Sequence, residues 1–395
     1  MRKNRVYGLD VLRALAIIIV LIGHCAILMP PRVQLVLNTL VVIDAVTLFF
    51  VLSGFLIGRI LIKTFEQDRV TFKTIAHFWL RRWFRTLPAY FIVLFLLAII
   101  YQQYSKRLLL KYALFVQNFN APIKEWFTES WSLSIEEWFY LLTPLIFLIA
   151  IRIFKPDTRK AFLYTSLAFI IAFPLYRLYK YYHVPLPRDH HSWDFFFRMQ
   201  VTTRLDSLMY GVFGAWVYYY HRDKWQRQRK AKAIAGAVMI VLARAVGIYY
   251  IVVHEGLYSC VFSFSIEAFA VLLILPYFEN IKTGKGFLAP VMTFTSIISY
   301  SLYLLNFAMV AIWLMYIWPT FGLSGYSYHV MRFVMFWTLS VGLSICLYVL
   351  VEYPFLKLRD RIVKDTPPVQ EPEMKKETDY AAMTLPTVDS KSVSN

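Results

Sequence analysis

The chain has 395 residues, of which 59% are hydrophobic, and its mean hydropathy is +0.53. A soluble domain averages about 45–50% apolar residues, so this composition argues against an ordinary soluble fold and predicts a surface that faces lipid. The formal net charge is +18, although only 17% of the residues are charged. Membrane proteins gather Lys and Arg in their cytoplasmic loops, so this charge does not require a nucleic-acid partner, and we expect none.

The N-terminal segment carries positive charges ahead of an apolar run, as a signal peptide does. That run contains Arg13 and His24 and has no small-residue cleavage site, so it predicts a retained first transmembrane helix. A transmembrane helix needs about 20 predominantly apolar residues. The sequence therefore predicts an all-α, polytopic transmembrane bundle of about ten helices, at 9–29, 38–61, 86–101, 131–151, 161–180, 205–220, 233–253, 259–278, 294–317 and 330–352.

Positive charge is distributed unevenly about these segments. With a cytoplasmic N-terminus, the inner segments hold about 26 Lys and Arg, against about 11 in or near the outer ones. The run from His221 to Lys232 contributes six of the inner residues. This bias predicts that both termini are cytoplasmic, that residues 222–232 lie inside and that residues 183–198 lie outside.

The sequence predicts one transmembrane domain, residues 1–362. Residues 363–395 are rich in Pro, Glu, Lys, Thr and Ser, and they cannot bury enough apolar area to become ordered, so they predict a disordered cytoplasmic tail. Cys25, Cys260 and Cys346 all lie in apolar runs and form no disulfide framework. His190 and His191 are adjacent and so are poorly placed to share one ion, and we expect no metal site.

Ionisable residues at membrane depth cost roughly 2.5–3.5 kcal/mol on insertion scales, so each requires a reason. In the first helix, Arg13 and His24 are eleven residues apart, which places them on one face about 16 Å apart along the axis. Asp10 and Arg13 could simply form an ion pair one turn apart. His24 could be a neutral histidine satisfied by a neighbouring helix, or a titratable group near the outer side.

Glu136 and Glu137 lie about 8 Å inside the outer end of the fourth predicted helix. They reach the membrane layer of His24 from the opposite direction. A carboxylate there could orient the imidazole and raise its basicity, as the acid of a hydrolase triad does. The alternative is that one of the two glutamates faces outer water.

Arg82 and Arg85 lie one turn apart between the second and third predicted helices. Paired guanidinium groups suit a phosphate, although an isolated pair is more often ordinary cytoplasmic charge. Four further polar residues lie in or beside apolar segments: Arg204, Asp206, Asn306 and Glu352.

Seven segments in register resemble the membrane-bound acyltransferase 3 family, which includes bacterial O-antigen, peptidoglycan and Nod-factor acyltransferases. The matching segments span residues 8 to 355 and are GLDVLRALAIIIVLIGH, DAVTLFFVLSGFLIG, FWLRRWFRTLPAY, WSLSIEEWFYLLTPL, RLDSLMYG, SYSLYLLNFAM and VEYPF. The resemblance implies an enzyme of the bacterial inner membrane that O-acylates a carbohydrate of the cell envelope. It also implies acyl-CoA as the donor substrate, with acetyl as the default group, and no bound cofactor.

By this resemblance, the family's arginine–histidine motif falls on Arg13 and His24, its paired-arginine motif on Arg82 and Arg85, and a further motif on Glu136. His24 would either deprotonate a sugar hydroxyl or carry the acyl group, and Glu136 would orient it. Arg82 and Arg85 would hold the CoA phosphates, and Arg13 would line the pantetheine path. The supporting residues would be Asp10, Ser53, Glu137, Arg204, Asp206, Asn306 and Glu352.

The chain departs from the family's pattern at two positions. The family commonly has a histidine where this chain has Asn306, which argues against a two-histidine mechanism. The family commonly has an acidic residue where this chain has Thr47, and this difference would alter how the donor or the acceptor is positioned. Two other functions would also require buried polar residues, namely a transporter or flippase of a lipid-linked glycan and a membrane sensor. A transporter commonly has a pair of helices broken by Gly or Pro at matching positions of its two halves. The sequence shows no such pair, which argues against this alternative.

Overall fold

The computed structural model describes residues 5–41, 43–67, 70–102, 105–122, 126–155, 157–183, 193–253, 256–319 and 321–362. Within these ranges the chain forms helices and no strand, which confirms the prediction of an all-α fold. The predictions for the tail at 363–395 and for His190 and His191 fall outside the described residues.

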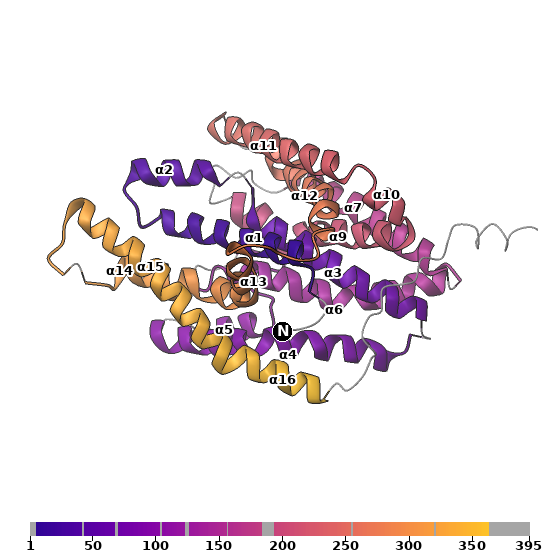
Figure 1. Cartoon of the computed structure of the whole chain (residues 1–395), viewed down its shortest axis with the longest axis horizontal. Coiled ribbons are helices and arrows are strands. Elements are labelled where there is room, and N and C mark those ends of the chain that lie inside the picture. Colours follow the sequence, from indigo (N-terminus) through magenta and orange to yellow (C-terminus); the bar gives the residue numbers. More distant parts are fainter. Residues whose placement is uncertain are drawn as a thin grey trace, which may run out of the picture.

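Most of the long helices run roughly along the long axis of one bundle (Figure 1). Short helices and turns join them, and four stretches of wider π-helical geometry carry the label η. The helices are α1 (Tyr7–Ala26), α2 (Pro31–Leu40), α3 (Ala45–Gln67), α4 (Phe72–Tyr101), α5 (Lys106–Ala113), α6 (Ser130–Ile153), α7 (Thr158–His183), η1 (Asp194–Arg198), α9 (Val201–Tyr220), α10 (Arg222–Gln226), α11 (Arg229–Val253), η2 (Tyr258–Phe262), α12 (Ser263–Glu279), α13 (Leu288–Leu305), η3 (Asn306–Ala311), α14 (Ile312–Tyr316), α15 (Gly325–Leu347), η4 (Tyr348–Glu352) and α16 (Tyr353–Ile362).

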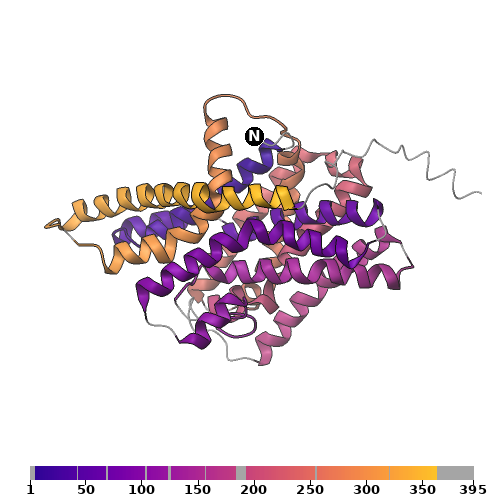
Figure 2. The same ribbon diagram turned by 90° about the horizontal axis from the view of Figure 1, so that it is seen from below.

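Eight helical spans in the described part of the chain are long and apolar enough to cross a membrane, judged by length and composition. The two remaining predicted segments, 205–220 and 233–253, coincide with α9 and α11. Figure 2 shows that α15, η4 and α16 continue as one long rod beside α4. The protein is therefore an integral membrane helical bundle.

The prediction for the third span was wrong at its start. The sequence indicated 86–101, but α4 begins at Phe72 and runs for 30 residues. A capping box starts it, since Thr71 and Thr74 each accept a hydrogen bond from the other's backbone N–H. Hydropathy alone ends the span at the arginines. In the folded protein, Arg82 instead lies inside the helix and is paired with a carboxylate of α6.

Helices α3 and α9 approach each other closely because glycines line their contact. A Cβ atom on Gly54 would lie 1.9 Å from the carbonyl oxygen of Leu208, and one on Gly211 would lie 2.1 Å from that of Val51. Gly54 and Gly58 form the small-xxx-small spacing that allows membrane helices to pack backbone to backbone. This contact fixes the start of α3 against the start of α9, where several functional candidates lie.

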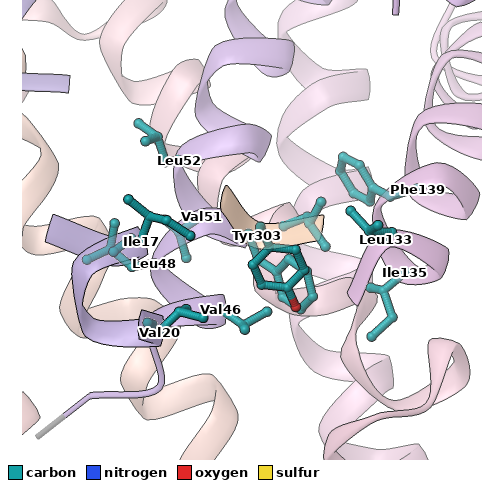
Figure 3. Close-up of a cluster of buried hydrophobic side chains, with 14 of the residues drawn as sticks. Ile17, Val20, Val46, Leu48, Val51, Leu52, Leu133, Ile135, Phe139 and Tyr303 are labelled. Carbon is teal, nitrogen blue, oxygen red and sulfur yellow. The ribbon is translucent and has the colours of Figure 1, made fainter. Parts of the chain in front are cut away.

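The apolar core extends from α1 and α3 to α6 (Figure 3). The labelled side chain of Tyr303, from α13, lies between the α1 and α3 residues on one side and Leu133, Ile135 and Phe139 of α6 on the other. Its hydroxyl shares a 2.6 Å hydrogen bond with Ser132 and donates one of 3.1 Å to the backbone oxygen of Glu129. The core thereby holds the end of α13 against the beginning of α6.

Candidate active site

The predicted site histidine, His24, lies half-buried near the end of α1, and its ring contacts the beginning of η3. Its Nδ1 atom is hydrogen-bonded to Oδ1 of Asn306, and its ring centroid is 4.6 Å from that of Phe307. Asn306 is fully buried. The residue at which the chain departs from the family's histidine is therefore the direct partner of His24.

The hydrogen bonds of Asn306 determine the tautomer of His24. The Asn306 side-chain nitrogen donates to the backbone oxygens of Leu302 (2.7 Å) and Tyr303 (2.9 Å), which leaves its carbonyl oxygen facing the ring. An amide oxygen can only accept, so Nδ1 must carry the proton. In the neutral ring, Nε2 then holds the free lone pair and is the basic and nucleophilic atom.

Asn306 begins a π-helical stretch, and such stretches often occur at functional sites. Glu129, which is buried just before α6, accepts the backbone N–H of Ala308 at 2.9 Å. The Tyr101 hydroxyl donates to the backbone oxygen of the same residue at 2.7 Å. These contacts tie η3 to α4 and α6 and so fix Asn306 beside His24. Glu129 was not among the predicted residues, and its one signal in the sequence is an acid directly before an apolar helix.

Asp44 and the arginines that bind it form a charged group at the same end of the bundle as His24. Asp44 precedes α3 and accepts hydrogen bonds from Arg198 (3.2 Å), Arg204 (3.3 Å) and Thr47 (3.1 Å). Burial opposes ionisation of Asp44, but the two guanidinium groups together hold its pKa well below the usual range. Arg198 is also close enough to His24 for electrostatic interaction. We call His24, Asn306, Arg198 and Asp44 the histidine cluster.

This arrangement bears on the second departure from the family's pattern. Thr47 has no carboxyl group, but its hydroxyl donates a hydrogen bond to Asp44 and accepts one of 2.7 Å from the buried Arg204. Asp44, three residues earlier, therefore brings a carboxylate to Thr47 and Arg204. Arg204 was among the predicted site residues, whereas Asp44 and Arg198 were not, because they lie 154 residues apart in sequence and only the fold pairs them.

Glu136 does not have the partner that the sequence analysis gave it. Its carboxylate accepts hydrogen bonds from Arg82 (3.1 Å), Tyr140 (2.7 Å) and Ser53 (3.3 Å), and the described contacts of the His24 ring are with Asn306 and Phe307. The expected pairing of Glu136 with His24 is thus replaced by an ion pair between α6 and α4. Arg82 provides that ion pair because α4 begins earlier than its hydropathy suggested.

Arg13 lies near this ion pair. It is close enough to Arg82 and Glu136 for electrostatic interaction, and it lies 3.8 Å from Asp10, as the spacing in α1 predicted. We call Arg13, Arg82 and Glu136 the arginine cluster. Helix α1 therefore carries His24 at one polar cluster and Arg13 at the other, about 16 Å apart along the helix.

The remaining predicted residues lie in structural contacts. Glu137 accepts from Thr86 at 2.9 Å, and Glu352 accepts from Ser301. Glu352 is also near enough to Arg85 to interact with its charge. Asp10 accepts from Arg5 (2.6 Å) and Ser296 (3.0 Å) as well as facing Arg13.

Asp206 forms a fully buried two-bond ion pair with Arg177, with contacts of 3.0 and 2.8 Å. Arg177 also donates to the backbone of Val261 and Thr203 and to Ser265, so this pair ties α7 and α9 to η2 and α12. A fully buried ion pair with this many hydrogen bonds holds the helices together, and both of its partners are occupied by those bonds. We therefore place Asp206 in the scaffold rather than at the site.

Comparison with known proteins identifies the family of the chain. A sequence model described as an acyltransferase domain matches residues 6–353. A provisionally named O-acetyltransferase of Staphylococcus aureus strain COL is 25% identical over 331 residues, which cover 77% of this chain and 50% of the relative. The O-acetyltransferase OatA of S. aureus strain NCTC 8325 is 33% identical over 169 residues, which cover 38% of this chain and 26% of OatA.

The chain thus spans about half the length, or less, of these curated relatives. No solved structure matches it significantly.

Proposed function

Because the chain belongs to the acyltransferase domain family whose model matches residues 6–353, we propose that it is a membrane-embedded O-acyltransferase. It moves an acyl group, by default acetyl, from cytoplasmic acyl-CoA to a hydroxyl of a surface or lipid-linked carbohydrate. The names of its relatives, which describe O-acetyltransferases, support this reaction. The inner membrane of a bacterium, with both termini cytoplasmic, is the location that we propose for it.

One observation carries the proposal, namely the Nδ1 hydrogen bond of His24 to Asn306. It directs the free lone pair to Nε2, the atom that base or nucleophilic catalysis would use. In direct transfer, Nε2 takes the proton of an acceptor hydroxyl while the hydroxyl oxygen attacks the thioester carbon. The carbon–sulfur bond then breaks, and CoA leaves as a thiolate that takes up the proton. In the covalent route, Nε2 attacks the thioester carbon, and CoA leaves as a thiolate. The acceptor oxygen then attacks the acyl carbon, the bond from that carbon to Nε2 breaks, and the hydroxyl proton passes to the thiolate.

We assign donor binding to the arginine cluster together with Arg85. The CoA phosphates are anionic, and guanidinium groups bind phosphate through several charge-assisted hydrogen bonds. Arg82 is held by Glu136 and lies 3.9 Å from the Tyr140 ring, so it contributes as a fixed charge. The acyl chain end of the donor would then extend along α1 from Arg13 toward His24.

The test is acyl transfer by purified protein in nanodiscs, using acetyl-CoA labelled in the acetyl group and a mixture of envelope glycans. Label should appear on a carbohydrate oxygen, and free CoA should form in equal amount. Mass spectrometry of surface glycans from cells with and without the gene provides the second arm. A protein that moved a glycan across vesicles without consuming acetyl-CoA would instead be a flippase.

A further inference from the structure

Two cavities lie side by side along one face of α7. The first has a volume of about 360 Å³ and an apolar lining that includes Leu142, Ala172, Phe173 and Leu205. The second has a volume of about 390 Å³ and is lined by Asn120, Tyr176, Tyr179, Lys180, His183, Phe196 and Gln200. Tyr176 lines both cavities, so they adjoin, and we describe them together as one depression with an apolar part and a polar part.

The polar part contains a buried cation that has no carboxylate partner among the described residues. Lys180 is 6% exposed, and its ammonium group donates to Oε1 of Gln200. Gln200 is fixed in that orientation because its side-chain nitrogen donates to the backbone oxygen of Phe195 at 2.9 Å. A buried charge normally has an opposite charge beside it, and an amide oxygen supplies only part of one. The cavity at Lys180 therefore suits an anion.

The apolar part lies deeper along α7 than the polar part. Ala172, Phe173, Tyr176 and Lys180 recur at helical spacing and so share one face of α7. From Lys180 back to Ala172 is eight residues, or about 12 Å into the membrane from near the end of a spanning helix. A ligand that filled both parts would have an anionic head at the membrane surface and a chain that extends inward.

We propose that this depression binds a lipid-borne phosphate, with the phosphate at Lys180 and the hydrocarbon chain against Ala172, Phe173 and Leu205. A soluble anion would leave the apolar part empty, and a neutral lipid would leave Lys180 without an anion. The site lies at the same end of the bundle as the histidine cluster, because Gln200 follows the η1 helix that carries Arg198. Resting on the proposed function, we infer that the acceptor is a glycan linked to a lipid phosphate, anchored here while its sugar reaches His24.

The test is calorimetric titration of the full-length protein in detergent with farnesyl phosphate, a short polyprenyl phosphate. Inorganic phosphate and farnesol serve as the two half-ligands. Wild-type protein should bind farnesyl phosphate, and each half-ligand should bind at least tenfold more weakly. Lys180→Gln should lose about tenfold or more in affinity, because it removes a charge-assisted contact to phosphate. Lys180→Arg should retain binding, and Ala172→Trp should weaken it by filling the apolar part.

Lys160→Gln is the matched control, because Lys160 lies on the same helix but is 61% exposed and paired with Asp157. It should bind like the wild type. Equal affinities for Lys180→Gln and the wild type, or inorganic phosphate binding as tightly as farnesyl phosphate, would overturn the proposal. The measurement is of binding alone, so a protein that binds the probe but transfers no acyl group would refute the proposed function and leave the lipid site standing.

Discussion

At the scale of single residues, the partner of His24 decides which ring nitrogen can act. The sequence indicated that Glu136 would orient the ring, because both residues were expected about 8 Å from the outer surface. Depth along a helix says nothing about which way a side chain points around it. Asn306 makes the contact, and Glu136 faces Arg82. The sequence thus predicted His24 and Arg13 as site residues, while the pairings depended on helix rotations that only the fold determines.

Replacing Asn306 should impair catalysis without abolishing it. Asn306→Ala removes the acceptor that keeps the proton on Nδ1, so the ring can adopt the other tautomer. We expect a loss of about 10- to 100-fold in kcat, by analogy with the residues that orient metal-binding histidines. Steady-state rates of acetyl transfer would measure this, with acetyl-CoA affinity determined separately. A variant with an unchanged kcat would show that the amide does not orient His24.

The two arginines of α4 should differ in their effects. Arg82→Ala leaves Glu136 without its charged partner, which should lower stability by about 1–3 kcal/mol. Arg85→Ala should mainly weaken acetyl-CoA binding, by roughly tenfold, because it removes a charge-assisted contact to a CoA phosphate. Thermal unfolding and equilibrium binding of acetyl-CoA measure the two effects. Arg81→Ala, at an exposed position of the same helix, is the control. If Arg85→Ala bound acetyl-CoA as tightly as Arg81→Ala does, Arg85 would be removed from the donor site.

At the scale of helices, apolar runs predicted where the long helices lie, because lipid requires about 20 apolar residues per crossing. The start of α4 was predicted too late because hydropathy counts charged residues against a helix. In the fold, an ion pair with α6 accommodates Arg82 within α4. The π-helical stretches at Tyr258–Phe262, Asn306–Ala311 and Tyr348–Glu352 were not predicted. They depend on contacts such as that of Glu129 with Ala308, which join residues 179 positions apart.

The contact between α3 and α9 can be tested with one methyl group. Gly211→Ala would place a Cβ atom 2.1 Å from a backbone oxygen of α3, so the helices must separate. We expect a loss of about 1–3 kcal/mol or more, the usual cost of overpacking, and reduced activity because Asp44 and Arg204 would shift apart. Gly342→Ala meets nothing within 4 Å and should be neutral or slightly stabilising. Equal melting temperatures for the two variants would contradict this close packing.

At the scale of the whole molecule, the seven matching segments are scattered from residue 8 to residue 355, and folding brings several of them together around α1. Residues from α1, α4 and α6 form the arginine cluster, and residues from α1, η1 and η3 lie in the histidine cluster. The resemblance predicted most of these residues individually. It could not predict that they form two clusters, or that Asp44 would pair with Arg198 and Arg204, because those facts follow from helix packing.

The predicted topology places residues 222–232 and the end of α7 on opposite sides of the membrane. In a cysteine-free background, Lys230→Cys should react with an impermeant thiol reagent only after the membrane is opened. His183→Cys should react in intact cells. The physical basis is the more than twofold excess of Lys and Arg in the inner segments. Labelling of both positions from the same side would contradict it.

The central claim is that Nε2 of His24 performs the chemistry of acyl transfer, and His24→Ala tests it most directly. The measurement is transfer of labelled acetyl from acetyl-CoA to glycan by purified protein, alongside acetyl-CoA binding to the same sample. Base catalysis alone contributes about 10²–10⁴-fold in rate, so transfer should become undetectable while donor binding persists. His77→Ala, which removes an exposed histidine from α4, should behave like the wild type. A correctly inserted His24→Ala protein that transferred acetyl at a rate near that of the wild type would contradict the claim.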